Sequence, residues 1–287
     1  MRLDYTFKNK AKTARWHMRR FAAARKYGRQ ALEAAPIVLG NAIPKAGSHL
    51  INQVLQGLPQ IGPFVQAGFF PVNRGEDNSK LPQAAVLANI QRMRPGDIGY
   101  GYLHCEEPFL SALTGPGRAT IFVYRDPRDV ALSAMKYAAY MNKKHGLHEY
   151  MRTRVQSDEE RLNAIIQGIP EPGIDYSSIQ TRFAHYLGWL DQPDVLCLRF
   201  EDLIQDREAA FGRLLDYLAG IGFTPAISRE QAAAALHASI RPERSGTFRK
   251  GKPGGWKQAY TEANKTAFKQ TTGDLLVRLG YEEDENW

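Results

Sequence analysis

The residues that most clearly suggest chemistry lie between positions 44 and 50. Lys45 is followed by Gly47 and Ser48, shortly after the apolar residues 36–39. A glycine lets the backbone approach a phosphate closely, and a hydroxyl and a point charge can bind it. The order differs from a Walker A loop, where the lysine follows the second glycine. A phosphate-binding loop and an ordinary strand-to-helix turn both remain open for this segment.

A second segment, residues 125–133, follows the apolar residues 120–124. Asp126 and Pro127 are typical of the N-cap and first turn of a helix. Arg125 at the strand end and Ser133 two turns into the helix suit a phosphate group. The alternative is a capped helix with a solvated arginine. Because anions bind at helix N-termini, two such segments indicate one ligand with phosphate at two positions.

A third segment, residues 248–257, is rich in glycine and basic residues and has an aromatic residue near each end. Such a loop can close over an anion as a lid. An exposed flexible loop is the alternative.

These segments sit in an alternation of strands and helices, which predicts a mostly parallel sheet with helices on both faces. The expected strands are 37–39, 98–104, 120–124 and 195–200. The expected helices are 48–58, 84–93, 182–190, 207–218, 231–237 and 262–279, with a loop at 60–82 and an irregular stretch at 141–180.

The composition of the 287 residues is that of a globular protein, and the net charge of +8 favours an anionic partner. Residues 1–35 form a basic helical leader, either solvated or in contact with a membrane surface. We expect the two cysteines, Cys105 and Cys197, to be buried free thiols in a reducing compartment, since a metal site needs more ligands. With no transmembrane or signal-peptide pattern, we expect a cytoplasmic protein.

Together the three segments resemble the cytosolic-type sulfotransferase family, which uses the donor 3′-phosphoadenosine 5′-phosphosulfate (PAPS). The family's motifs read close to P-K-S-G-T-T-W, R-x-P-[RK]-D-V-A-x-S and R-K-G-x-x-G-x-W. This chain matches them at 44–50, 125–133 and 249–256, and matches a fourth motif, L-R-Y-E-D-L, at 198–203. The resemblance implies one sulfotransferase domain over 36–287, an α/β fold with a parallel sheet flanked by helices, in a P-loop-kinase-like three-layer sandwich.

The resemblance also implies roles for the matching residues. His104, between the first two motifs, takes the place of the general base, and the ordinary pKa of histidine suits that task. Lys45 would stabilise charge on the leaving phosphate oxygen, and no metal is implied. The implied donor contacts are Lys45, Ala46, Gly47, Ser48 and His49 for the 5′-phosphate, Arg125, Ser133, Arg249, Lys250 and Gly251 for the 3′-phosphate, and Phe200, Ala238, Ser239 and Ile240 beside adenine.

Four positions near the implied site depart from the family pattern, and the family's dimer motif near the C-terminus is broken in this chain. Tyr102 stands where the family has a lysine, two residues before the histidine. His49 and Leu50 replace a threonine and a tryptophan of the first loop, and Phe200 replaces a tyrosine. These changes bear on the contacts to the sulfonate and the adenine.

The implied function is transfer of a sulfuryl group from PAPS to a hydroxyl of a small-molecule, lipid-like or carbohydrate acceptor. Five aromatic residues would line an apolar slot for the acceptor or belong to the core: Phe64, Phe69, Phe70, Tyr137 and Tyr140. One alternative is a P-loop kinase or NTPase, which needs a lysine after Gly47 and an acid for Mg²⁺. Another is a non-catalytic protein that binds nucleic acid or anionic surfaces, although no nucleic-acid partner is expected. The oligomeric state stays open.

Overall fold

A computed structural model describes residues 2–67, 71–241 and 252–287, which form two compact units. The first comprises the described residues of Met1–Ile43, Gly47–Tyr124 and Trp189–Arg249. The second comprises those of Pro44–Ala46, Arg125–Gly188 and Lys250–Trp287. Within the described ranges, the first unit holds every strand and the second is helical. The predicted boundary after residue 35 lies inside the first unit.

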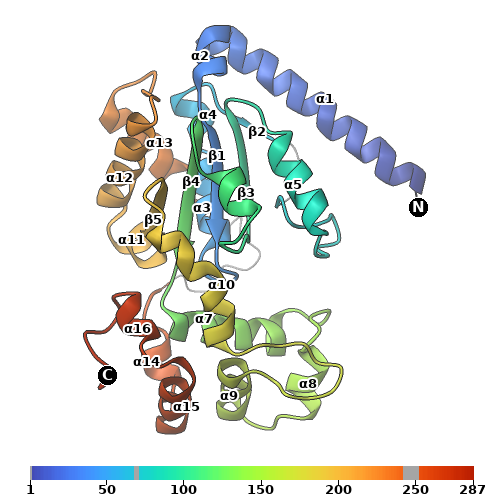
Figure 1. Cartoon of the computed structure of the whole chain (residues 1–287), viewed down its shortest axis with the longest axis vertical. Helices are drawn as coiled ribbons and strands as arrows, with labels where there is room; N and C mark the ends of the chain where they lie inside the picture. Colours follow the sequence, from blue (N-terminus) through green and yellow to red (C-terminus); the bar gives the residue numbers. More distant parts are fainter. Residues whose placement is uncertain (1, 68–70, 242–251) are drawn as a thin grey trace. The chain divides into compact units, whose positions relative to one another are not determined.

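Five parallel strands make the sheet of the first unit, in the order β2-β3-β1-β4-β5 (Figure 1). They are β1 Ile37–Ala42, β2 Val65–Gln66, β3 Asp97–Gly101, β4 Arg118–Tyr124 and β5 Val195–Arg199. From β1 the chain goes to β2 and β3 on one side, then crosses to β4 on the other. Ligands of open α/β sheets bind at the carboxyl ends of the strands around such a reversal.

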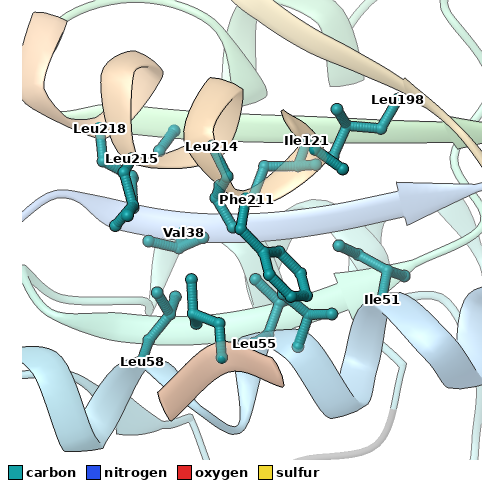
Figure 2. Close-up of a cluster of buried hydrophobic side chains, with 14 of the residues drawn as sticks. Val38, Ile51, Leu55, Leu58, Ile121, Leu198, Phe211, Leu214, Leu215 and Leu218 are labelled. Atoms are coloured by element: carbon teal, nitrogen blue, oxygen red, sulfur yellow. The ribbon is translucent and has the colours of Figure 1, made fainter. Parts of the chain in front are cut away.

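The helices of the first unit cover both faces of this sheet. They are α1 Arg2–Tyr27, α2 Arg29–Ala34, α3 Ser48–Leu55, α4 Leu58–Ile61, α5 Gln83–Gln91, α6 Phe109–Leu113, α11 Phe200–Gln205, α12 Arg207–Gly220 and α13 Arg229–Ser239, with a short 3₁₀ helix at Gly188–Asp191. On one face, Val38 and Ile121 pack against Ile51 and Phe211 of α3 and α12 (Figure 2). Burial of these apolar side chains is the main stabilising contribution to this layer.

Close approach of α3 to the sheet depends on Gly40 in β1. A Cβ atom there would lie 2.7 Å from Leu55 Cδ1 and 3.2 Å from Ile51 Cγ1, so a larger residue would displace these side chains of α3. On the opposite face, Thr120 donates from Oγ1 to Leu113 O at the end of α6, at 2.7 Å. The predicted fold class, a parallel sheet between two helical layers, is confirmed.

The helices of the second unit pack mainly against one another. They are α7 Pro127–Lys136, a π-helical turn at Tyr137–Met141, α8 His148–Thr153, α9 Asp158–Gln167, α10 Ile179–Leu187, α14 Trp256–Ala259, α15 Glu262–Thr272 and α16 Leu275–Arg278. Asp126 caps α7 by accepting from Arg128 N at 2.9 Å, and Pro127 occupies its first turn. This predicted helix start is confirmed.

Several predictions about secondary structure are wrong. Residues 141–180 contain α9, which begins at a capping box formed by Ser157 and Glu160, a signal present in the sequence. Residues 60–82 contain the short strand β2, whose two residues are too few to show a pattern. The helix expected at 262–279 is two helices, because Gly273 adopts a φ of 51° that ends α15.

Throughout the described ranges, no helix combines the length and the apolar character that crossing a lipid bilayer requires.

Candidate active site and donor-binding residues

The backbone after β1 makes a tight turn into α3. Gly47 adopts the left-handed region with a φ of 107°, and Lys45 has a φ of 73°. A Cβ atom on Gly47 would lie 2.5 Å from Cδ2 of Phe200, so only glycine fits. The Phe200 ring, predicted to lie beside adenine, therefore packs directly against the loop predicted to hold the 5′-phosphate.

Ser48 opens α3 and is only 6% exposed. Its Oγ accepts a hydrogen bond from the hydroxyl of Tyr102 at 2.9 Å. Tyr102, which stands where the family has a lysine, therefore contacts the loop predicted to hold the 5′-phosphate. Of the flanking loop residues, Ala46 is buried and His49 is exposed.

His104 follows β3 at the carboxyl edge of the sheet. The strand was expected to reach residue 104, but it ends at Gly101. Beyond it, Asn41 of β1 donates from Nδ2 to Leu103 O at 2.9 Å and accepts from Leu103 N at 2.8 Å. The buried Asn41 side chain thus takes the place of a strand partner and fixes the segment that carries His104.

Two further contacts hold the same segment. Asn73 donates to Tyr102 O at 2.7 Å and accepts from Tyr102 N at 3.2 Å. The indole of the fully buried Trp189 donates to Leu103 O at 2.9 Å. The His104 side chain remains 40% exposed, with Nδ1 3.8 Å from Oε1 of Glu106. A fixed backbone and an accessible ring suit a general base.

The segment predicted to flank adenine lies at the end of α13, next to α3. Gln53 of α3 donates to Arg241 O at 2.8 Å and accepts from Arg241 N at 3.0 Å. Ser239 lies against Gly57, where an added Cβ would meet Ser239 Cβ at 3.0 Å. Ala238 is exposed and Ile240 is half-buried. The first unit therefore places residues 238–240 beside the helix that begins at Ser48.

In the second unit, Lys45 lies over the ring of Tyr137, with Nζ 3.8 Å from the ring centroid. Burial, and then the charge of Arg125, lower the pKa of Lys45 to about 8. The edge of the Tyr137 ring meets His145, with centroids 5.7 Å apart. Burial, then Lys45 and His148, lower the pKa of His145. From the sequence we expect Tyr137 only in the acceptor slot or the core, and no local pattern indicates its contacts with Lys45 and His145.

Arg125 and Asp129 form an ion pair of 3.2 Å at the start of α7, and both side chains are largely buried. The two Asp129 oxygens also accept from Gly254 N at 2.8 Å and Trp256 N at 3.0 Å. Asp129 therefore ties the second motif to the described end of the third. Ser133 lies one helical turn further along α7 and is half-buried.

Arg128, the other arginine of the second motif, is 2% exposed and has a structural role. It pairs with Asp126 at 2.8 Å and with Glu282. Its guanidinium lies 3.8 Å from the ring centroid of Trp256 and 4.5 Å from that of Trp287. The sequence motif alone did not separate this buried arginine from Arg125.

Some predicted residues lie outside the described ranges, namely Arg249, Lys250, Gly251, Phe69 and Phe70. Of the aromatic residues considered for an acceptor slot, Phe64 is a core residue, 1% exposed and edge-on to Phe223. Tyr140 is 47% exposed and bonds Asp158 and Arg161. The core alternative therefore holds for Phe64 but not for Tyr140.

The family model of the sulfotransferase domain matches residues 119–280, which is more than half of the chain. The chain therefore belongs to the sulfotransferase domain family, and the predicted family is confirmed.

Sixty-six chains of solved structures match this chain significantly, whereas none of the curated proteins does. The mouse sulfotransferase SULT7A1 complexed with PAP is 14% identical, with a TM-score of 0.60 over 91% of each chain. Retinol dehydratase in complex with androsterone and inactive cofactor PAP is also 14% identical, with a TM-score of 0.53 over 85% of this chain and 83% of its own. At this identity the likeness supports the fold.

Proposed function

We propose that this protein transfers a sulfuryl group from PAPS to a hydroxyl group of an acceptor. The observation that carries the proposal is the junction of β1 and β3. There the Gly47–Ser48 turn packs on Phe200, and Asn41 fixes the segment that ends in His104. Both similar structures contain PAP, which is PAPS without its sulfuryl group.

The reaction needs one proton acceptor and stabilisation of one leaving group. As the acceptor oxygen forms a bond to sulfur, the sulfur–oxygen bond to the 5′-phosphate breaks, and the hydroxyl proton passes to His104 Nε2 or Nδ1. Lys45 stabilises the negative charge that develops on the phosphate oxygen. With a pKa of about 8, Lys45 is mostly protonated at pH 7 and can do so.

The donor residues are proposed in two groups, one for the 5′-phosphate and adenine and one for the 3′-phosphate. The groups are Lys45, Ala46, Gly47, Ser48 and His49 for the 5′-phosphate, with Phe200, Ala238, Ser239 and Ile240 for adenine, and Arg125, Ser133, Arg249, Lys250 and Gly251 for the 3′-phosphate. The chemistry of these residues fits a bisphosphate, since they offer cations, hydroxyls and a helix N-terminus. Asp129 supports the second group, because it holds both Arg125 and the backbone of Gly254.

The test is a transfer assay with radiolabelled PAPS and a panel of phenols, sterols and carbohydrates. We include a sterol first because androsterone is bound in the retinol dehydratase structure. We expect labelled product without added metal and none with labelled ATP and Mg²⁺. Transfer from ATP would instead support the kinase alternative. No transfer to any class, together with no binding of PAP, would contradict the proposal.

We also propose a peripheral contact with anionic membrane through α1, at the cytoplasmic face. The inner side of this helix is held by Asp97, which accepts from Trp16 Nε1 and Arg20 Nη1, each at 2.9 Å. On its outer side Met18 is 62% and Phe21 is 72% exposed. The exposed Arg15, Arg19 and Arg25 accompany them. Exposed apolar residues among arginines suit an anionic bilayer surface.

Sedimentation with vesicles tests this contact. We expect binding to vesicles that contain phosphatidylserine and little binding to pure phosphatidylcholine. The Met18→Ser, Phe21→Ser double variant should lose binding while keeping its thermal unfolding temperature, because neither side chain is buried. Equal sedimentation with both vesicle types would contradict a specific contact with anionic lipid.

A further inference from the structure

Tyr102 is a phenol at a position where the sequence pattern leads us to expect a cation. Its hydroxyl donates to Ser48 Oγ at 2.9 Å, across 54 residues of sequence. Ser48 is the hydroxyl residue of the loop proposed to hold the 5′-phosphate. The phenol therefore contacts the proposed donor loop at the buried Ser48 hydroxyl.

The structure holds both partners of this hydrogen bond in place. The amide group of Asn73 binds both the N–H and the carbonyl of Tyr102, which fixes its backbone. The Arg74 guanidinium carbon lies 5.9 Å from the centroid of the Tyr102 ring. On the other side, Gly47 is confined by Phe200, and Ser48 begins a helix that packs on β1. A bond between two fixed groups loses little conformational entropy on ligand binding.

The direction of this bond has a chemical consequence. A serine hydroxyl carries one proton, and it can accept and donate at once. When Ser48 Oγ accepts from Tyr102, its own proton is left to donate elsewhere. A chain of donors that ends on an anion is strengthened along its length. The pair can therefore present a directed, uncharged donor to a phosphate oxygen.

We propose that Tyr102 is a positioning residue that orients the Ser48 hydroxyl toward the 5′-phosphate of the bound nucleotide. The inference rests on the proposed function and deepens it. A neutral relay from tyrosine to serine to phosphate takes the place of a direct contact from a lysine. It follows that the contribution of this position to donor binding depends on Ser48 and responds weakly to salt.

Calorimetry with two nucleotides tests the relay without knowledge of the acceptor. PAP carries both phosphates, whereas adenosine 3′-phosphate lacks the 5′-phosphate. Tyr102→Phe should weaken PAP binding about tenfold, the size of one lost hydrogen bond to a charged chain. Binding of adenosine 3′-phosphate should stay within about twofold, because the Tyr102 hydroxyl does not act on the 3′-phosphate.

Two matched variants complete the test. In a Ser48→Ala background, Tyr102→Phe should have no further effect on PAP binding, since the relay is already broken. Tyr100→Phe, two residues earlier and still within β3, should leave PAP binding unchanged because Tyr100 packs against the apolar core. Compared with Tyr102→Phe, Tyr102→Lys should regain PAP affinity, but this affinity should depend more steeply on salt than that of the wild type. Circular dichroism and thermal unfolding confirm that each variant folds.

The outcomes separate this inference from the proposed function. Unchanged PAP affinity in Tyr102→Phe, an equal loss for both nucleotides, or additive losses in the double variant would each overturn the relay. A wild-type protein that binds neither nucleotide would overturn the proposed donor site instead. If Tyr102→Phe does not fold, a selective loss of PAP affinity in Ser48→Ala supports the relay and an unselective loss overturns it.

Discussion

The segments that carry the proposed functional residues are fixed by different physical means in the two units. In the first unit, neutral amides and hydroxyls fix the segment before His104, through Asn41, Asn73 and the bond between Tyr102 and Ser48. In the second unit, charges do this work: Asp129 holds Arg125, and Arg128 pairs with Asp126. Neutral hydrogen bonds keep their strength across salt and pH, whereas breaking one partner of a buried ion pair leaves a charge uncompensated. The difference predicts distinct responses to mutation.

The largest effect is expected at His104, in the first unit. His104→Ala should lower turnover by about 10²–10⁴-fold, because the acceptor loses its general base. PAP affinity should change little. His237→Ala, an exposed histidine of the same unit, is the matched control. Near wild-type turnover of His104→Ala would place the base elsewhere, and His145 would be the next residue to test.

In the second unit, the largest effect on stability is expected at Asp129. Asp129→Ala removes this acceptor from Arg125 Nη2 and from two backbone N–H groups. We expect the free energy of unfolding to fall by about 3–5 kcal/mol, measured by urea denaturation. Asp216→Ala, which breaks an exposed pair with Arg229, should change the free energy of unfolding far less, because solvent screens that pair. A similarly small loss of stability in both variants would show that burial does not strengthen the Arg125–Asp129 pair.

The corresponding change in the first unit is Asn41→Leu, which keeps the branched shape of the side chain but removes both hydrogen bonds to Leu103. Leaving a buried polar group unsatisfied should cost about 1–3 kcal/mol of stability. Turnover should fall more than PAP affinity, because the loss acts on the segment that carries His104. Gln53→Leu, which removes two bonds to Arg241, is the control with equal bond loss away from His104. Equal loss of turnover in both variants would argue against a positioning role for Asn41.

The smallest predicted effect concerns pH and Lys45. Its pKa of about 8 means that the cation is present at pH 7 and mostly lost at pH 9. At pH 9 Lys45 must therefore take up a proton when the phosphate binds, which costs free energy. PAP affinity should weaken as pH rises from 7 to 9, by up to about tenfold. Lys45→Arg, which stays charged, should show a flat profile over the same range. A flat wild-type profile would mean that Lys45 does not face the phosphate.

Local patterns in the sequence predicted local structure well. Asp126 and Pro127 correctly predict the start of α7, and runs of apolar residues predict four of the five strands. Contacts between distant segments were not predictable. Asn41 and Leu103 are 62 residues apart, and nothing at either position indicates that an amide extends β3. The cluster of Tyr137 and His145 around Lys45 is equally non-local. The motifs identified candidate ligand contacts, but the residues that position them depend on the fold.

The central claim is a donor site that recognises phosphate at both the 3′ and the 5′ position of adenosine. Calorimetry of PAP against adenosine 5′-phosphate tests it most directly. Without the 3′-phosphate, Arg125 and Ser133 lose their proposed ligand, so binding should weaken by about 2–4 kcal/mol, or roughly 30- to 1,000-fold. Equal affinity for the two nucleotides would contradict the assignment of the second motif and, with it, the proposed PAPS site.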